Sequence, residues 1–156
     1  MARAVPLLFA AALAAAVGCT PAAPSFAGDP SPELGAYFAA ERGCGTCHSD
    51  GHGTLAGSSR PIPKTTVYAS NLTPDPETGL GNWADSQILR ALRTGVDDNL
   101  QFLCPSMIHY DDLGDLEGRS LVAYLRSLPA VARPDIPESR CPPIKPFDAA
   151  LWPGMD

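Results

Sequence analysis

Residues 44–48 read Cys-Gly-Thr-Cys-His and directly follow Gly43. The two thiols lie three positions apart, and an imidazole follows the second thiol immediately. The whole chain of 156 residues contains only five cysteines and three histidines, so the spacing of these few residues is informative. The chemistry of this stretch decides how the rest of the sequence is interpreted.

The spacing predicts covalent attachment of a c-type haem, for which Cys-x-x-Cys-His is the attachment signature. Two thiols at this spacing can add to the two vinyl groups along one porphyrin edge, and the next imidazole then points at the iron. We therefore predict one haem c, bound through Cys44 and Cys47, with His48 as an axial ligand.

Three other chemistries use some of the same residues. A thioredoxin-like redox pair needs a βαβ context, which this sequence does not show. A zinc site of Cys44, Cys47, His48 and His52 has enough ligands, but no second Cys-x-x-Cys or spaced histidine pair accompanies it. A structural disulfide between Cys44 and Cys47 leaves His48 without a role. These three interpretations are the less favoured alternatives.

The other axial ligand decides whether the iron is closed or open to small molecules. Met1 leaves with an export signal and Met155 is next to the C-terminal residue, so Met107 is the one thioether within the domain. It lies among polar neighbours outside any helical period, where packing alone does not call for methionine. We predict Met107 as the sixth ligand, which raises the reduction potential, with His109 as the alternative.

The remaining sequence predicts an all-α domain with three main helices, long loops and a proline-rich C-terminal extension. A first helix starts at Ser31-Pro32-Glu33 and ends at Gly43, and others span about 85–94 and about 115–128. Gly118 weakens the last of these by roughly 1 kcal/mol relative to alanine. Three short helices bury little core by themselves, so the cofactor is expected to form part of it.

Composition excludes one class of function. The chain has 17 acidic and 11 basic residues and a net charge of −6, and Lys64 and Lys145 are its only lysines. A nucleic-acid binder that works through a basic patch is therefore excluded.

The N-terminal sequence predicts export. The stretch 5–17 is apolar apart from one proline, too short to span a bilayer and suited to a signal-peptide core. It ends in Ala-Val-Gly-Cys19, which resembles the lipobox of bacterial lipoproteins. We predict a signal peptide over 1–18, lipidation at Cys19 and a flexible tether over 19–32, which places the protein on the periplasmic side of a membrane. Ordinary cleavage nearby, with Cys19 incidental, is the alternative.

The stretch from Gly43 to about Leu128 resembles class I monohaem cytochromes c. More narrowly, it is similar to the cytochrome domains of bacterial membrane alcohol and sugar dehydrogenase complexes. The resemblance is carried by the haem motif and the Met107 loop, together with the runs NLTPDPETGLGNW (71–83), RALRTGV (90–96) and LVAYLRSLP (121–129). It implies a cytochrome c domain over 33–128 that transfers electrons and is not itself an enzyme. Its implied partners are a dehydrogenase donor and an oxidase or another cytochrome as acceptor.

The resemblance also implies finer positions. The first and last helices should cross beside the haem edge, with Tyr37, Phe38 and Tyr124 as candidates for the crossing. The ring N–H of His48 should donate to the carbonyl of Pro61 or Pro63.

Further details concern the polar surroundings of the haem. Trp83 and Arg60 are candidate ligands of the haem propionates, with a packing role for Trp83 and a solvated charge for Arg60 as equal alternatives. Ala84 leaves the expected capping box of the second helix half empty, so that Asp85 is the candidate cap. Asn71 either belongs to these polar surroundings of the haem or simply stabilises its own turn.

Counting cysteines leaves Cys104 and Cys141, which are predicted to form a disulfide. Seven of the 28 residues in 129–156 are proline, so this extension is expected to lie extended over the domain. The bridge would pin the extension over the Met107 loop; the alternative is a bridge that only anchors the tail.

Together these observations predict an exported single-electron carrier with a His/Met-ligated haem. One rival is a haem enzyme, or a sensor of peroxide or a diatomic gas, with Met107 detached and an open sixth position. Another is a structural lipoprotein domain held together by haem or zinc.

Overall fold

The computed structural model of the chain describes residues 28–142. The predicted signal peptide, the predicted lipidation site Cys19, the predicted tether up to residue 27 and the extension beyond residue 142 lie outside the described residues.

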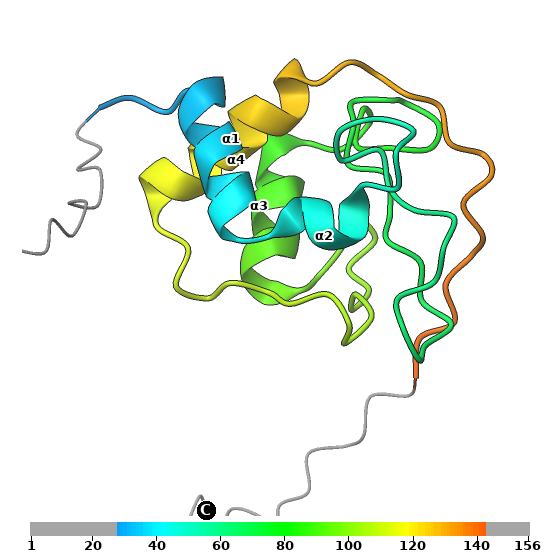
Figure 1. The fold of residues 1–156 in the computed structure, drawn as a ribbon. Helices are drawn as coiled ribbons and strands as arrows, with labels where there is room; N and C mark the ends of the chain where they lie inside the picture. Colours follow the sequence, from blue (N-terminus) through cyan, green and yellow to red (C-terminus); the bar gives the residue numbers. More distant parts are fainter. Residues whose placement is uncertain (1–27, 143–156) are drawn as a thin grey trace, which may run out of the picture.

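Four helices form the described part (Figure 1): α1 (Pro32–Glu41), α2 (Cys44–His48), α3 (Asp85–Thr94) and α4 (Asp115–Ser127). The three main helices are confirmed, and α2 is a single additional turn that carries the Cys-x-x-Cys-His motif. Between residues 28 and 142 no β-strand forms, and pairing is limited to isolated bridges such as Pro61 with Tyr68 and Val96 with Phe102.

The start and end of α1 follow the local sequence signals. Ser31 Oγ accepts a hydrogen bond from the Leu34 N–H at 3.2 Å, and Pro32 occupies the first turn. Gly43 adopts the left-handed conformation (φ 69°), which favours glycine, and lies between α1 and α2. The motif is therefore attached to the end of α1 by one tight reversal.

The start of α3 differs from the prediction. Ala84 is the N-cap, in extended conformation, and the Gln87 Oε1 accepts from the Ala84 N–H at 2.6 Å. Asp85 is the first helical residue and not the cap, and its carboxylate lies 2.9 Å from the Arg126 guanidinium of α4. The cap position falls one residue before Asp85, on an alanine, so no side chain caps α3.

Replacing Ala84 with serine is expected to complete the capping box and raise the free energy of unfolding by about 1 kcal/mol, because the new hydroxyl can accept an unpaired N–H of the first turn. Chemical denaturation of the purified protein measures the change. The matched control is Ala130→Ser, since Ala130 is also exposed but precedes no helix. Equal midpoints for both variants would contradict the assignment of Ala84 as the cap.

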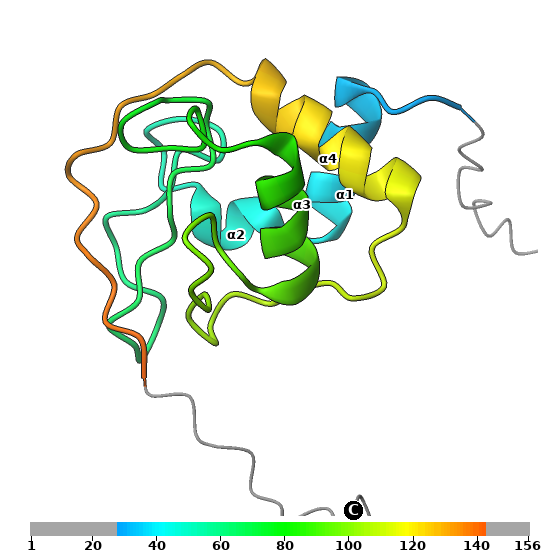
Figure 2. The same ribbon diagram turned by 180° about the vertical axis from the view of Figure 1, so that it is seen from behind.

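Helices α1 and α4 pack directly against each other, as the view from behind also shows (Figure 2). A Cβ built on Gly35 would lie 1.9 Å from the Ser120 carbonyl oxygen, so the two backbones touch at this point. Phe38 and Tyr124 pack on a core cluster of Ala39, Leu113 and Leu121, as expected for the crossing. Tyr37 is 37% exposed, and the glycine that permits the close approach was not predicted.

Gly35→Ala is expected to lower the free energy of unfolding by about 2 to 3 kcal/mol. The added methyl group meets main-chain atoms, which cannot rotate away, and forces α1 off α4. Thermal or chemical unfolding measures the loss. Gly118→Ala is a suitable comparison, because its new Cβ would meet the end of the flexible Leu89 side chain at 2.8 Å. If Gly35→Ala is as stable as the wild type, the two backbones do not touch there.

A second core cluster joins the loops to the helices and comprises Leu55, Leu80, Ile88, Val122, Leu125 and Leu128. Cys44 and Tyr124 are partly buried against both clusters. The core therefore converges on Cys44, at the start of α2.

The segment 129–142 runs extended along the loops that connect α2 to α3 (Figures 1 and 2). Asn71 of these loops is 2% exposed, and its side-chain amide donates to the Val131 carbonyl at 2.7 Å. Its side-chain oxygen also accepts from the Thr73 N–H and hydroxyl, so Asn71 does stabilise its turn. The long loops are held together by polar side chains and by this returning segment.

Candidate haem site

Helix α2 presents both thiols of the motif. Cys44 is partly buried and Cys47 exposed, and neither is in a disulfide. Burial raises the pKa of the Cys44 thiol. The alternatives that pair these two cysteines with each other therefore find no support in the geometry.

The orientation of His48 fixes which ring nitrogen can bind a metal. The side chain is buried, and its Nδ1 lies 2.7 Å from the Ser70 carbonyl oxygen. A carbonyl only accepts, so Nδ1 carries the proton and Nε2 keeps its lone pair. Burial lowers the pKa of this imidazole because the charged form is disfavoured. A neutral imidazole with a free Nε2 is the form that ligates iron.

The predicted acceptor for His48, the carbonyl of Pro61 or Pro63, is wrong. The Gly57 N–H donates to the His48 carbonyl at 2.8 Å, and the Ser58 N–H donates to the Ala69 carbonyl at 2.9 Å. These bonds bring the segment 69–70 back beside His48. The bridge between Pro61 and Tyr68 closes the chain between them into a separate excursion.

His52 does not join a metal cluster with the motif. Its side chain is exposed, and its Nδ1 lies 2.9 Å from the Asp50 carboxylate. Within residues 28–142, no group of three or more His, Cys, Asp or Glu side chains is placed to hold a metal ion. The zinc alternative is therefore not supported in this part of the chain.

The predicted sixth ligand lies in a loop that is anchored at both ends. Met107 is partly buried, and its N–H donates to the Cys104 carbonyl at 2.8 Å. At the other end, the Tyr110 N–H donates to the Leu92 carbonyl of α3 at 2.7 Å, and the Arg42 guanidinium covers the Tyr110 ring at 4.9 Å. The alternative ligand His109 is exposed and lies beside Gly95, at the end of α3.

Three large apolar side chains in the Met107 loop or just before it are exposed. Leu100, Phe102 and Ile108 are 69%, 70% and 68% exposed. The donor set of the site is two free thiols and a neutral imidazole with an unprotonated Nε2, which is the set that a covalently bound haem requires.

The predicted disulfide between Cys104 and Cys141 is present, with the two Cα atoms 5.0 Å apart. It joins the segment 129–142 to the residue that accepts the Met107 N–H. The extension thus reaches from the loops beside His48 to the Met107 loop.

Trp83 and Arg60 occupy different surroundings. Trp83 is partly buried against the core cluster of Leu55 and its neighbours, and its carbonyl accepts from Arg126. Arg60 is exposed and donates to the Asp50 carbonyl at 3.3 Å. Their predicted contacts with haem propionates stay predictions.

Arg133 is the functional candidate that the sequence reasoning missed. It is 4% exposed, and its guanidinium binds the Asp50 carboxylate at 2.9 Å as well as the carbonyls of Ala56 and Gly57. This pairing holds the pKa of Asp50 well below its ordinary value, because Arg133 donates to the ionised carboxylate. Asp50 lies 83 positions from Arg133, and no local pattern links the two.

Comparison with known proteins places the chain as a distant homologue of cytochrome c subunits of dehydrogenases. It is 34% identical over 107 residues to the fructose dehydrogenase cytochrome subunit of Gluconobacter japonicus, covering 65% of this chain and 22% of that protein. It is 33% identical over 94 residues to the cytochrome c subunit of a quinone alcohol dehydrogenase from Gluconobacter oxydans, covering 58% and 20%.

A further relative is the gluconate 2-dehydrogenase cytochrome c subunit of Pantoea cypripedii, 33% identical over 102 residues, or 63% of this chain and 23% of that protein. The chain thus spans less than a quarter of the length of these curated relatives. No protein-family model matches the chain. The resemblance to cytochromes of dehydrogenase complexes is confirmed at this level. Within the described residues, no helix is both long and apolar enough to cross a membrane.

Proposed function

We propose that this protein is a single-electron carrier with one covalent haem c, held by Cys44 and Cys47 and ligated by His48 and Met107. The observation that carries the proposal is the geometry of α2: two unpaired thiols, followed by an imidazole whose Nδ1–H is bound to the Ser70 carbonyl. When bound, the haem iron supplies the one-electron chemistry, and the axial pair sets its potential.

The chain's own residues have three tasks in this proposal. His48 is held in one tautomer, so that Nε2 keeps its lone pair for the iron. The Met107 loop, anchored at Cys104 and Tyr110, would hold the thioether as the second protein ligand of the iron. The clusters that border Cys44 exclude water from one edge of the site.

We further propose that the protein works outside the cytoplasm, tethered through Cys19, and exchanges electrons with a dehydrogenase donor and an oxidase or cytochrome acceptor. The cytochrome subunits among its relatives support a dehydrogenase partner. The acidic balance of the chain favours partners with basic or apolar docking surfaces.

A visible and near-infrared spectrum of the purified protein tests the proposal. Low-spin haem with a methionine-to-iron charge-transfer band is the expected result. High-spin haem would favour the alternative of an enzyme or a sensor with an open sixth position. Absence of haem bands would leave only a structural role.

A further inference from the structure

Two main-chain segments hold His48 from different sides. Its Nδ1–H donates to the Ser70 carbonyl at 2.7 Å, and its own carbonyl accepts the Gly57 N–H at 2.8 Å. The bond from the Ser58 N–H to the Ala69 carbonyl joins these two segments beside the imidazole. The position of the Ser70 carbonyl therefore depends on how the segments 56–58 and 69–71 are fixed.

The Arg133 guanidinium fixes the first of these segments. Its Nη1 donates to the carbonyls of Ala56 and Gly57 at 3.0 and 3.3 Å. The same group binds both carboxylate oxygens of Asp50, at 3.1 and 2.9 Å. Asp50 lies two residues after His48, so a single buried cation joins the chain near the imidazole to the segment that returns beside it. A planar fork of five donors can do this, whereas an ammonium group cannot.

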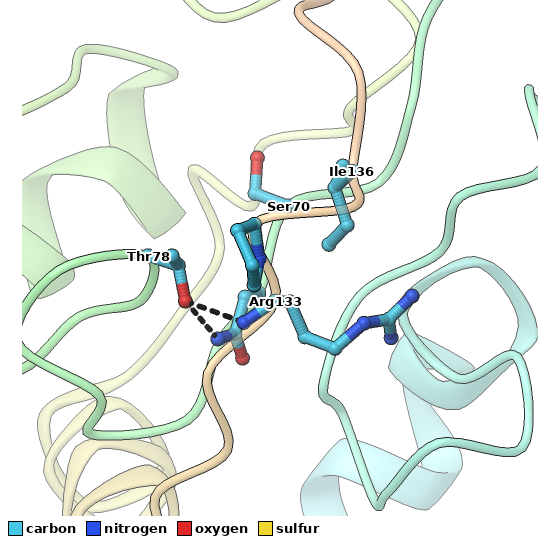
Figure 3. Close-up of a pocket in the computed structure, with 6 residues that line it drawn as sticks. Ser70, Thr78, Arg133 and Ile136 are labelled. Carbon is cyan, nitrogen blue, oxygen red and sulfur yellow. Dashed lines mark hydrogen bonds between the residues drawn. The ribbon is translucent and has the colours of Figure 1, made fainter.

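The backbone around Arg133 fixes the second segment (Figure 3). The Arg133 N–H donates to the Thr78 hydroxyl at 2.9 Å, and this hydroxyl also accepts from the Asn71 side chain at 3.1 Å. Ser70, Arg133 and Ile136 line the same pocket. Ile136 lies so close to Gly57 that a Cβ there would be 2.5 Å from its Cδ1.

We propose that Arg133 is a positioning residue for the His48 imidazole, because it locks the segment 129–142 onto Asp50, Ala56 and Gly57 and so keeps the Ser70 carbonyl aligned with Nδ1. This inference rests on the proposed function, in which Nε2 of the same ring ligates haem iron. A well-aligned hydrogen-bond acceptor on Nδ1 makes Nε2 a stronger electron-pair donor to the metal and so stabilises the oxidised metal. Arg133 thereby sets the reduction potential from outside the haem pocket.

The test compares Arg133→Gln with the wild-type haem-loaded protein. We expect the exchange of the His48 Nδ1 proton with solvent, followed by NMR, to become at least tenfold faster. The reduction midpoint should rise by up to about 59 mV, which corresponds to a tenfold change in the ratio of reduced to oxidised protein. Arg133→Lys keeps the charge beside Asp50 and should give intermediate values for both.

Asp135→Asn is the matched control. The half-exposed Asp135 carboxylate binds the same guanidinium at 2.8 Å, so this variant removes a partner of Arg133 while leaving its bonds to Asp50, Ala56 and Gly57 available. It should keep the wild-type midpoint and proton exchange.

The possible results distinguish a failure of the inference about Arg133 from a failure of the proposed function. If Arg133→Gln loses stability but keeps the wild-type midpoint and exchange, Arg133 is only a structural clamp and the inference is overturned. If Arg133→Gln does not accumulate with haem, Arg133→Lys decides by the same two measurements. If the wild-type protein itself carries no haem, the proposed function fails, and the inference with it.

Discussion

Replacing Met107 with alanine is expected to abolish the methionine-to-iron charge-transfer band of the oxidised protein and to lower its midpoint. A thioether ligand favours the reduced iron, so its loss should lower the midpoint by more than about 59 mV, a tenfold change in the redox ratio. Near-infrared absorption and a spectroelectrochemical titration measure the two effects.

His109→Ala is the control for this prediction. The His109 ring lies beside Gly95 at the end of α3, two residues along the chain from Met107. Its removal should leave the band and the midpoint unchanged. The reverse result, in which His109→Ala alters the spectrum and Met107→Ala does not, would establish the bis-imidazole alternative.

Local signals made the helices predictable. Ser31 and Pro32 start α1, and Gly95, in left-handed conformation, ends α3. Both partners of each of these interactions lie within a few residues of each other, so a short stretch of sequence is enough to predict them. The same holds for the motif of α2, where three adjacent functional groups define the chemistry.

Contacts between distant segments were not predictable in this way. The acceptor of the His48 N–H is Ser70 because several main-chain bonds fold the intervening loop back on itself. Arg133 finds Asp50 across 83 positions, and Gly35 meets Ser120 across a helix crossing. In each case the partner depends on the path of the whole chain, which a single sequence does not reveal.

The disulfide is an exception among the long-range contacts. Cys104 and Cys141 lie 37 positions apart, yet counting sufficed because each of the other cysteines already had a predicted role. Counting cysteines does not decide whether the bridge also restrains the Met107 loop or only anchors the C-terminal extension.

The double variant Cys104→Ser/Cys141→Ser is expected to lower the free energy of unfolding by about 3 to 4 kcal/mol. The bridge closes a loop across 37 positions and restricts the unfolded chain accordingly. Denaturant titration of the haem-loaded protein measures the loss. Wild-type protein whose disulfide has been reduced is the control and should lose a similar amount.

The near-infrared band of the same variant decides what the bridge holds. The Met107 N–H donates to the Cys104 carbonyl, so the disulfide restrains the start of the Met107 loop. Without the disulfide, the loop is still held by the Leu103 N–H on the Gly95 carbonyl and by the Tyr110 N–H on the Leu92 carbonyl. We expect the charge-transfer band to weaken at temperatures well below global unfolding, as the loop opens locally. If the band instead persists up to the unfolding transition, the main-chain bonds at Leu103 and Tyr110 are sufficient, and the bridge serves only to fasten the extension that carries Arg133.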